Sequence, residues 1–430
     1  METTIKVIWN KSKILVKGFI VFIIFLLLQI PAMFVRDLVQ ERESRQKEAI
    51  TEVSSKWAGK QTVAGPVLVL PYSEGPTKFM ATILPDSLSV DASVEPQEKY
   101  RGIYKIMLYN SSSRITGEFK ELNLSKLNIN PANVMWNEAY FKIFISDVKG
   151  LNDEISINVN DQSFAFSPFE SGEGLTAPVR LNGPEEIQHL TFSTNINLNG
   201  AEQLLFTPVG RSTSVSMNSK WPHPSFTGDV LPQKSDIKET GFTASWKSLS
   251  HNRNFPQQWK NDEYKIQNLN KDAVLNVNSS AFGTDLFIPV NSYQKTMRSV
   301  KYAALCILLT FAAFFLIETN NNKSVHPFHY GLIGVALIIF YTLLLSLSEY
   351  VGFNLSYLVA SAATIGLITW FVASLLQSAK FSLLLSVLLV LMYTYIFTIL
   401  QLQDYSLLLG SIGLFITLAV LMHFSKRIRW

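Results

Sequence analysis

The chain has 430 residues, 48% of them hydrophobic, and a formal net charge of only +4 at pH 7. So small a charge, with no basic stripe in the polar part of the chain, gives no indication of nucleic-acid binding. The single cysteine, Cys306, excludes an internal disulfide framework, and its place in an apolar run indicates an ordinary packing residue.

Long apolar runs lie near the start of the chain and in its last third. A bilayer core of about 30 Å requires roughly 20 apolar residues in helical form. The first run covers residues 14–35 and includes Lys17. Five more follow, at residues 302–317, 330–347, 355–376, 381–400 and 405–424. We therefore predict six transmembrane helices.

The first run is predicted to be a retained anchor rather than a cleaved signal peptide. Its apolar core exceeds the usual 7–15 residues, and no small-x-small cleavage pattern closes it. Pro31 removes a backbone hydrogen bond within this run. We interpret the expected bend at Pro31 as structural rather than as a gate.

The distribution of Lys and Arg predicts the orientation, because these residues concentrate in short cytoplasmic segments. Six spans that start inside place both termini in the cytoplasm. The inside segments then hold Lys6, Lys11, Lys13, Lys17, Lys323, Lys380, Lys426, Arg427 and Arg429. The short outside loops contain Glu349 and Asp404 and no basic residue. The polar region is thus expected outside, in the periplasm of a host with two membranes.

The polar region, residues 36–298, is predicted to be a helix followed by a β domain. Residues 36–58 carry Ile50, Val53 and Trp57 at helical spacing. After them, short β-prone runs alternate with Gly, Pro, Asn and Asp clusters, as is typical of an antiparallel sandwich. These runs are residues 67–72, 79–84, 103–109, 115–119, 141–145, 155–159, 190–198, 214–218, 242–246 and 274–277, with a long loop expected at 251–272.

The expected fold is therefore an α+β membrane protein with three parts. Residues 1–35 form the cytoplasmic N-terminus and the first helix. Residues 36–298 form a large antiparallel, sandwich-like periplasmic domain inserted between the first and second helices, with the β part at 59–298. Residues 299–430 form five transmembrane helices and a short cytoplasmic C-terminus.

The sequence contains no motif that indicates an enzyme. It lacks Gly-x-Gly-x-x-Gly, a Walker loop, His-Glu-x-x-His and Gly-x-Ser-x-Gly. His189 and His251 are isolated in polar sequence and are expected at the surface. His326 and His329 form a His-x-x-His pair that lacks a third nearby ligand. We therefore expect no catalytic residue, no cofactor and no metal site.

Charged residues inside a membrane span are costly and usually functional. The last five predicted spans have essentially no charged residue at mid-depth, and Glu318 and Glu349 lie at span ends. We expect water or lipid headgroups to solvate both carboxylates, which argues against a proton-driven pump.

One segment of the β domain, residues 220–232, has an unusual composition. Prolines on both sides of a histidine restrict the backbone, and a rigid segment loses little entropy on binding. The candidate interaction motif consists of Trp221, Pro222, His223, Pro224, Phe226 and Asp229. The alternative, which we favour, is a structural corner in which Trp221 and Phe226 fill the sandwich.

Several motifs of the sequence, including the one just described, resemble those of the CreD family of bacterial inner-membrane proteins, also called cell envelope integrity proteins. The first is Trp-Pro-His-Pro-Ser-Phe-x-Gly-Asp-x-Leu-Pro at residues 221–232, followed by Gly-Phe-x-Ala-x-Trp at residues 241–246. The membrane half matches at residues 301–315, 326–330 and 340–353, which contain His326, Pro327, Tyr330 and Glu349. The resemblance extends over nearly the whole chain.

The resemblance implies an inner-membrane output of a two-component stress response, tied to envelope integrity, colicin tolerance and the response to β-lactams. It transfers no catalytic residue, so we expect a protein that is not an enzyme. The expected partners are the lipid bilayer and an envelope protein, glycan or lipid.

Two functional hypotheses remain open. In the first and favoured one, the β domain binds an envelope component while the helices anchor it. In the second, helices and β domain together handle a lipid or a lipid-linked substrate. A lipid handler should show a continuous apolar groove on the sandwich, whereas a binding module should show a polar surface around a few anchors.

Overall fold

The computed structural model describes residues 2–120, 122–169, 174–267, 276–286, 292–320, 325–402 and 408–413, with residues 415, 419 and 422. The chain forms two compact units. The helical unit comprises Met1–Lys47 and Val290–Trp430, and the β unit comprises Glu48–Pro289.

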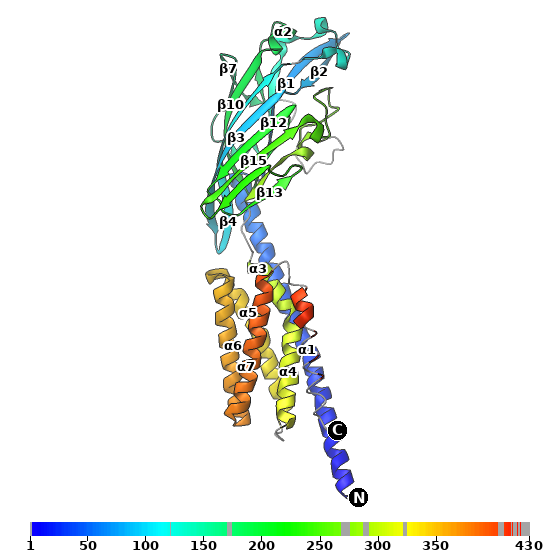
Figure 1. Ribbon diagram of the computed structural model, residues 1–430, viewed down its shortest axis with the longest axis vertical. Coiled ribbons are helices and arrows are strands. Elements are labelled where there is room, and N and C mark those ends of the chain that lie inside the picture. Colours follow the sequence, from blue (N-terminus) through cyan, green and yellow to red (C-terminus); the bar gives the residue numbers. More distant parts are fainter. Residues whose placement is uncertain are drawn as a thin grey trace. The chain divides into compact units, whose positions relative to one another are not determined.

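Among the described residues, the helical unit contains the long helix α1, the shorter helices α3 to α7 and a helical segment at residues 408–413 (Figure 1). The long helix α1 (Glu2–Trp57) continues through Pro31, and its last ten residues belong to the β unit. The others are α3 (Ser292–Lys301), α4 (Ala303–Asn320), α5 (Pro327–Val351), α6 (Phe353–Leu376) and α7 (Ala379–Gln401). Gly352 separates α5 from α6 with a φ of 78°, a value that favours glycine.

The confirmed part of the membrane prediction is the presence of apolar helices that can span a bilayer. In the described part of the chain, four helices are long and apolar enough: α1, α5, α6 and α7. The pair α3 and α4, bent by 43°, makes a fifth if it counts as one span. The predicted sixth span, residues 405–424, lies largely outside the described residues, so the six-helix bundle stays a prediction.

The described residues of the β unit include a nine-stranded sheet. Its main path runs β13-β17-β11-β1-β5-β9-β8, with β2 on β1 and β16 on β2. The strands are β1 (Gln61–Glu74), β2 (Thr77–Ile83), β5 (Tyr140–Ile145), β8 (Ser167–Pro168), β9 (Leu175–Pro178), β11 (Gln203–Phe206), β13 (Pro224–Gly228), β16 (Gln258–Lys260) and β17 (Phe282–Leu286).

A second sheet has, in the described part of the unit, eight strands in the order β14-β15-β12-β3-β4-β10-β6-β7. It is built around three long strands (Figure 1). Its strands are β3 (Ser87–Arg101), β4 (Tyr104–Phe119), β6 (Ser156–Val159), β7 (Gln162–Ala165), β10 (Leu190–Ala201), β12 (Ser212–Ser219), β14 (Lys234–Lys238) and β15 (Gly241–Leu249). A short helix, α2 (Pro184–Ile187), precedes β10.

The sheets are mixed, so the prediction of a purely antiparallel domain was wrong in this respect. β1 pairs with β11 in parallel, and β12 pairs with β3 in parallel. Parallel neighbours require long crossover connections. Here the chain supplies them by visiting the other sheet between the two members of each pair. The α+β class itself is confirmed.

The two sheets pack face to face across one apolar core. Phe119 of β4 contacts Phe141 of β5, with ring centroids 6.1 Å apart. Trp246 of β15 stacks on Phe282 of β17 at the same distance. A smaller cluster joins the end of α1 to the eight-stranded sheet through Ile50, Val53, Trp57, Ile106, Leu108 and Ala201. The β unit therefore has a filled interior, and its candidate binding surfaces are external.

Candidate functional site

The helical unit contains a buried carboxylate, Glu318, near the end of α4. It is 4% exposed. Its oxygens accept hydrogen bonds from the Val325 backbone N–H at 2.6 Å and from the Tyr330 hydroxyl at 2.7 Å. The Lys17 ammonium of α1 donates to the same carboxylate and to the Val325 carbonyl. The negative charge of Glu318 and the hydrogen-bonding capacity of its two oxygens are thus satisfied within one cluster of residues.

A second carboxylate, Glu349, lies in the last turn of α5. Its side chain is 8% exposed. It accepts a hydrogen bond from the Tyr293 hydroxyl of α3 at 3.0 Å, and the Arg42 guanidinium of α1 lies 3.9 Å away. Each carboxylate therefore has one cation from α1 and one tyrosine hydroxyl.

The expectation that water or headgroups solvate Glu318 and Glu349 was wrong. Both are buried because α1 packs on the other helices and brings Lys17 and Arg42 to them. An unpaired charge in this setting would be costly, which explains why each carboxylate has a cation beside it.

Helix α1 approaches α5 closely between these two ion pairs. A Cβ on Gly334 would lie 2.2 Å from Leu28 Cδ1, so any larger residue there would force the Leu28 side chain to shift. Lys17 and Arg42 are about 25 residues, or roughly 38 Å of helix, apart. Only 17% of the apolar stretch of α1 is buried, against 56% of that of α5. The two ion pairs thus lie on either side of the apolar stretch of α1, which itself has little buried contact with the neighbouring helices.

The predicted membrane-half residues fall into two groups. His326 precedes α5 and accepts a hydrogen bond from the Phe328 N–H at 3.3 Å, with Pro327 at the first helical position. Tyr330 belongs to the Glu318 cluster, whereas Glu349 lies at the other end of α5. Within the described ranges, no group of three His, Cys, Asp or Glu side chains could hold a metal ion.

The predicted motif at residues 221–232 lies in the β unit, apart from these carboxylates. Trp221 is 7% exposed and donates from Nε1 to the His223 carbonyl at 2.9 Å. Phe226 packs edge-on against Trp246 of the opposite sheet, with centroids 5.6 Å apart. Pro222 and Pro224 are half-buried, while His223 and Asp229 are exposed. A role for this motif in binding stays a prediction.

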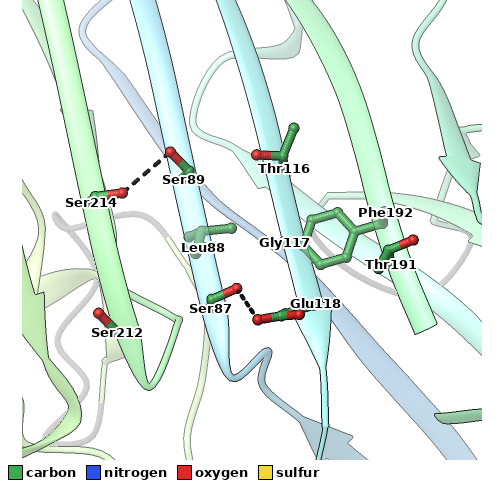
Figure 2. Close-up of a pocket in the computed structure, with 10 residues that line it drawn as sticks. All are labelled: Ser87, Leu88, Ser89, Thr116, Gly117, Glu118, Thr191, Phe192, Ser212 and Ser214. Atoms are coloured by element: carbon green, nitrogen blue, oxygen red, sulfur yellow. Dashed lines mark hydrogen bonds between the residues drawn. The ribbon is translucent and has the colours of Figure 1, made fainter. Parts of the chain in front are cut away.

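The outer face of the eight-stranded sheet has a shallow hollow of about 350 Å³ (Figure 2). Polar side chains, most of them Ser or Thr, surround it and come from four adjacent strands, β12, β3, β4 and β10. They include Ser87, Ser89, Thr116, Glu118, Thr191, Ser212 and Ser214. Ser214 and Ser89 are joined across the strands by a hydrogen bond of 3.2 Å.

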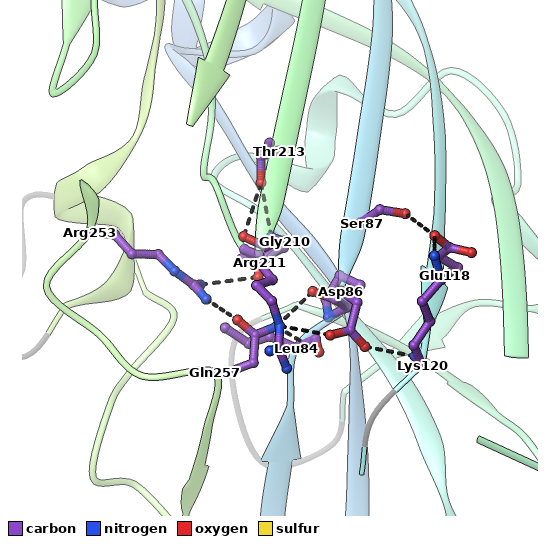
Figure 3. Close-up of polar contacts among 12 residues, drawn as sticks. Leu84, Asp86, Ser87, Glu118, Lys120, Gly210, Arg211, Thr213, Arg253 and Gln257 are labelled. Carbon is purple, nitrogen blue, oxygen red and sulfur yellow. Dashed lines mark hydrogen bonds and ion pairs between the residues drawn. The ribbon is translucent and has the colours of Figure 1, made fainter. Parts of the chain in front are cut away.

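A network of charged and amide side chains fixes the loops at one end of this hollow (Figure 3). Arg211 and Asp86 form an ion pair at 2.8 Å, and the Lys120 N–H donates to Asp86 at 2.7 Å. The Lys120 ammonium lowers the pKa of Glu118 through a hydrogen bond. This network thereby holds the loops in a fixed arrangement beside the hollow.

The same network contains a buried arginine (Figure 3). Arg253 donates to the Pro208 and Val209 carbonyls at 3.3 and 3.1 Å and to the Gln257 side chain. Burial, followed by repulsion from Arg211, lowers the pKa of Arg253 to about 10. Gln257 in turn donates to the Pro85 carbonyl at 2.7 Å. Arg253 therefore acts as a structural tie between three loops.

Sequence reasoning missed the ion pairs and the polar sheet face. The interruption of an apolar run by Lys17 was a usable signal, because a lysine inside a span requires a partner. The alternation of Ser and Thr with apolar residues in β12 was another. Neither signal identifies its partner, since Lys17 and Glu318 lie 301 positions apart.

Comparison with known proteins shows similarity along nearly the whole chain. A family model described as "Inner membrane protein CreD" matches residues 13–430. The inner membrane protein CreD of Escherichia coli (strain K12) is 31% identical over 421 residues, which cover 94% of this chain and 91% of that relative. The similarity thus includes the helical unit and the β unit.

Proposed function

Because the chain belongs to the CreD family of inner membrane proteins, we propose that its β unit lies in the periplasm and binds an envelope component. The helices anchor this unit in the inner membrane, with both termini in the cytoplasm. The protein contributes to envelope integrity and to the envelope stress response without being an enzyme. The excess of Lys and Arg in the segments assigned to the inside supports this orientation.

The outer face of the eight-stranded sheet is the observation on which the binding role rests. Alternate residues of its long strands point away from the core and are polar, and most of them are small and uncharged. They are Ser89, Asp91, Ser93, Ser112, Arg114, Thr116, Thr191, Asn195, Asn197, Ser214, Ser216 and Asn218. Hydroxyl and amide groups both donate and accept hydrogen bonds. Such a face suits an uncharged polar partner, a glycan or an exposed protein segment.

Lipid handling is the second hypothesis, and the surface of the β unit favours it less. A lipid-binding groove requires contiguous apolar surface. The large apolar side chains exposed in the described β unit lie on five different segments: Tyr100, Val148, Leu231, Ile237 and Leu249.

Co-purification from native membranes in a mild detergent tests the proposal, with proteins, glycans and lipids identified by mass spectrometry. The full chain is compared with Ser89→Arg/Ser214→Arg, which places two bulky cations on the polar face. Thr77→Arg, an exposed position on β2 of the other sheet, is the matched control. A stoichiometric envelope component that is lost only with the face variant supports the proposal. A specific lipid as the sole enriched component, or a component retained by the face variant, would contradict it.

A further inference from the structure

Three cationic side chains lie on one side of the short helix α3, which joins α4 at a bend of 43°. Lys295, Arg298 and Lys301 recur every three residues and therefore follow one another along the helix surface. Lys295 and Arg298 are partly exposed and Lys301 is exposed, whereas Tyr293 and Thr296 are buried against the other helices. Helix α3 is thus amphipathic, with a basic outer face.

The contacts of α3 place this basic face at one boundary of the membrane-spanning region. Tyr293 bonds to Glu349 in the last turn of α5, and Lys295 donates to Gln401, the last residue of α7. On α5, Glu349 lies nineteen residues from Tyr330 of the Glu318 cluster, or about 28 Å, which is close to the thickness of a hydrocarbon core. The basic face therefore lies where acyl chains meet headgroups.

The ammonium group of Lys295 is held in a defined position there. It donates to Gln401 Oε1 at 3.1 Å and lies 5.4 Å from the centroid of the Phe353 ring. Gln401 in turn donates to Asn354 Oδ1 at 2.7 Å. Residues of α6 and α7 thus orient a cation of α3, and a preorganised cation loses little entropy when it binds an anion.

The charges at this boundary are not balanced by the described residues. Arg298 repels Lys295, its neighbour on the helix surface. Glu349 is shared by Arg42 and Tyr293. Within the described ranges, no carboxylate forms an ion pair with a cation of α3, although the cations of α1 at both boundaries have one each. Several positive charges at this depth favour an external anion.

We propose that α3 binds an anionic phospholipid of the leaflet at the Glu349 end of the helical unit. The phosphodiester lies between Lys295 and Arg298, with Lys301 beside it, because a guanidinium and an ammonium both donate to phosphate oxygens. Leu308, two turns after Lys301 and 42% exposed, offers apolar surface to an acyl chain. The lipid remains bound to the helices, so the proposal is independent of the role of the β unit.

Native mass spectrometry of the full chain in a mild non-ionic detergent tests this proposal. The protein is titrated with phosphatidylglycerol and, separately, with phosphatidylcholine of the same acyl chains, and the affinity for the first bound lipid is measured. We expect phosphatidylglycerol to bind at least about tenfold more tightly, because its headgroup has no cation to oppose those of α3. Equal affinities would overturn the proposal.

Arg298→Gln removes one cation that forms no hydrogen bond or ion pair among the described residues. It should weaken the binding of phosphatidylglycerol about fivefold, and Lys295→Gln/Arg298→Gln should abolish the preference over phosphatidylcholine. The matched control is Lys380→Gln, an exposed cation in the first turn of α7, about 32 Å of helix from Gln401.

The control should keep the affinity of the unaltered protein. An unchanged affinity in Arg298→Gln, or equal losses in Arg298→Gln and Lys380→Gln, would refute the site. Should the double variant fail to fold, the comparison of these two single variants decides alone. A large excess of inorganic phosphate should not displace the lipid. Displacement would show that α3 binds free phosphate and would overturn the assignment to a phospholipid.

Discussion

At the scale of residues, Glu318 and Glu349 are the side chains that depend most on a nearby opposite charge and on hydrogen bonds. Removal of two opposite charges from water costs several kcal/mol per ion, which their attraction repays only with good geometry and further hydrogen bonds. Glu318 meets this condition through Lys17, Tyr330 and the Val325 N–H. The cluster therefore fixes the position of α1 on the other helices.

We expect Glu318→Gln to lower the stability of the helical unit by about 3 kcal/mol, because it leaves the Lys17 ammonium without its counter-charge. Thermal unfolding in detergent measures the effect. Lys17→Met/Glu318→Leu, which removes both charges, should restore part of the loss. Glu138→Gln, in an exposed ion pair with Lys78, is the control and should not change the midpoint. A Glu318→Gln variant as stable as the control would show that the ion pair does not hold α1.

We expect Trp221→Ala to destabilise the β unit by about 3–5 kcal/mol, the usual cost of truncating a buried aromatic side chain. Trp221 is buried, and its indole N–H bonds to the His223 carbonyl. Trp221→Phe should have a smaller effect. Thermal unfolding followed by near-UV circular dichroism distinguishes them. A Trp221→Ala protein of normal stability that has lost its envelope partner would instead identify the motif as a binding site.

At the scale of elements, the close approach of α1 to α5 depends on a single glycine. Transmembrane helices gain little from apolar contact alone, because lipid offers the same contact, and small residues that permit close packing stabilise their association. Gly334 lies against Leu28 of α1 and Phe311 of α4. It thereby allows the ion pairs at Lys17 and Arg42 to form at the same time.

We expect Gly334→Ala to weaken the packing of α1, because the added Cβ would lie 2.2 Å from Leu28 Cδ1. Leu28→Ala in the same chain should recover much of the lost stability. Gly331→Ala is the matched control, since its nearest neighbour, Ile24 Cγ2, would lie at an ordinary 3.9 Å. The unfolding midpoint in detergent reports all three. Equal midpoints for Gly334→Ala and Gly331→Ala would contradict this packing.

Elements with long apolar runs were predicted from the sequence, whereas the central strand β4 was divided and its neighbour β3 was missed. β4 was divided into two runs because Ser111 to Ser113 resemble a turn, yet Ser111 is buried and bonds to the Leu198 carbonyl at 3.0 Å. β3 was missed because Ser and Asp alternate with its small apolar residues. Both strands depend on neighbours that are distant in sequence, which local patterns do not contain.

At the scale of the whole molecule, each of the two units supplies a different part of the proposed role, which is membrane anchoring together with the binding of an envelope component. The helical unit supplies apolar helices and paired carboxylates, and the β unit supplies a broad polar sheet face above a filled core. The candidate site was predictable only in part. Glu349 and Tyr330 were singled out, but their partners Arg42, Lys17 and Glu318 follow from tertiary packing.

Photo-crosslinking in living cells tests the central claim, that the polar sheet face binds an envelope component in the periplasm. p-Benzoyl-phenylalanine is placed at Ser214 on that face and, as a control, at Thr77 on the other sheet. We predict a specific adduct from Ser214, with a periplasmic or cell-wall component, that Thr77 does not give. Identical adducts from both positions, no adduct from Ser214, or an adduct with a cytoplasmic protein would contradict the claim.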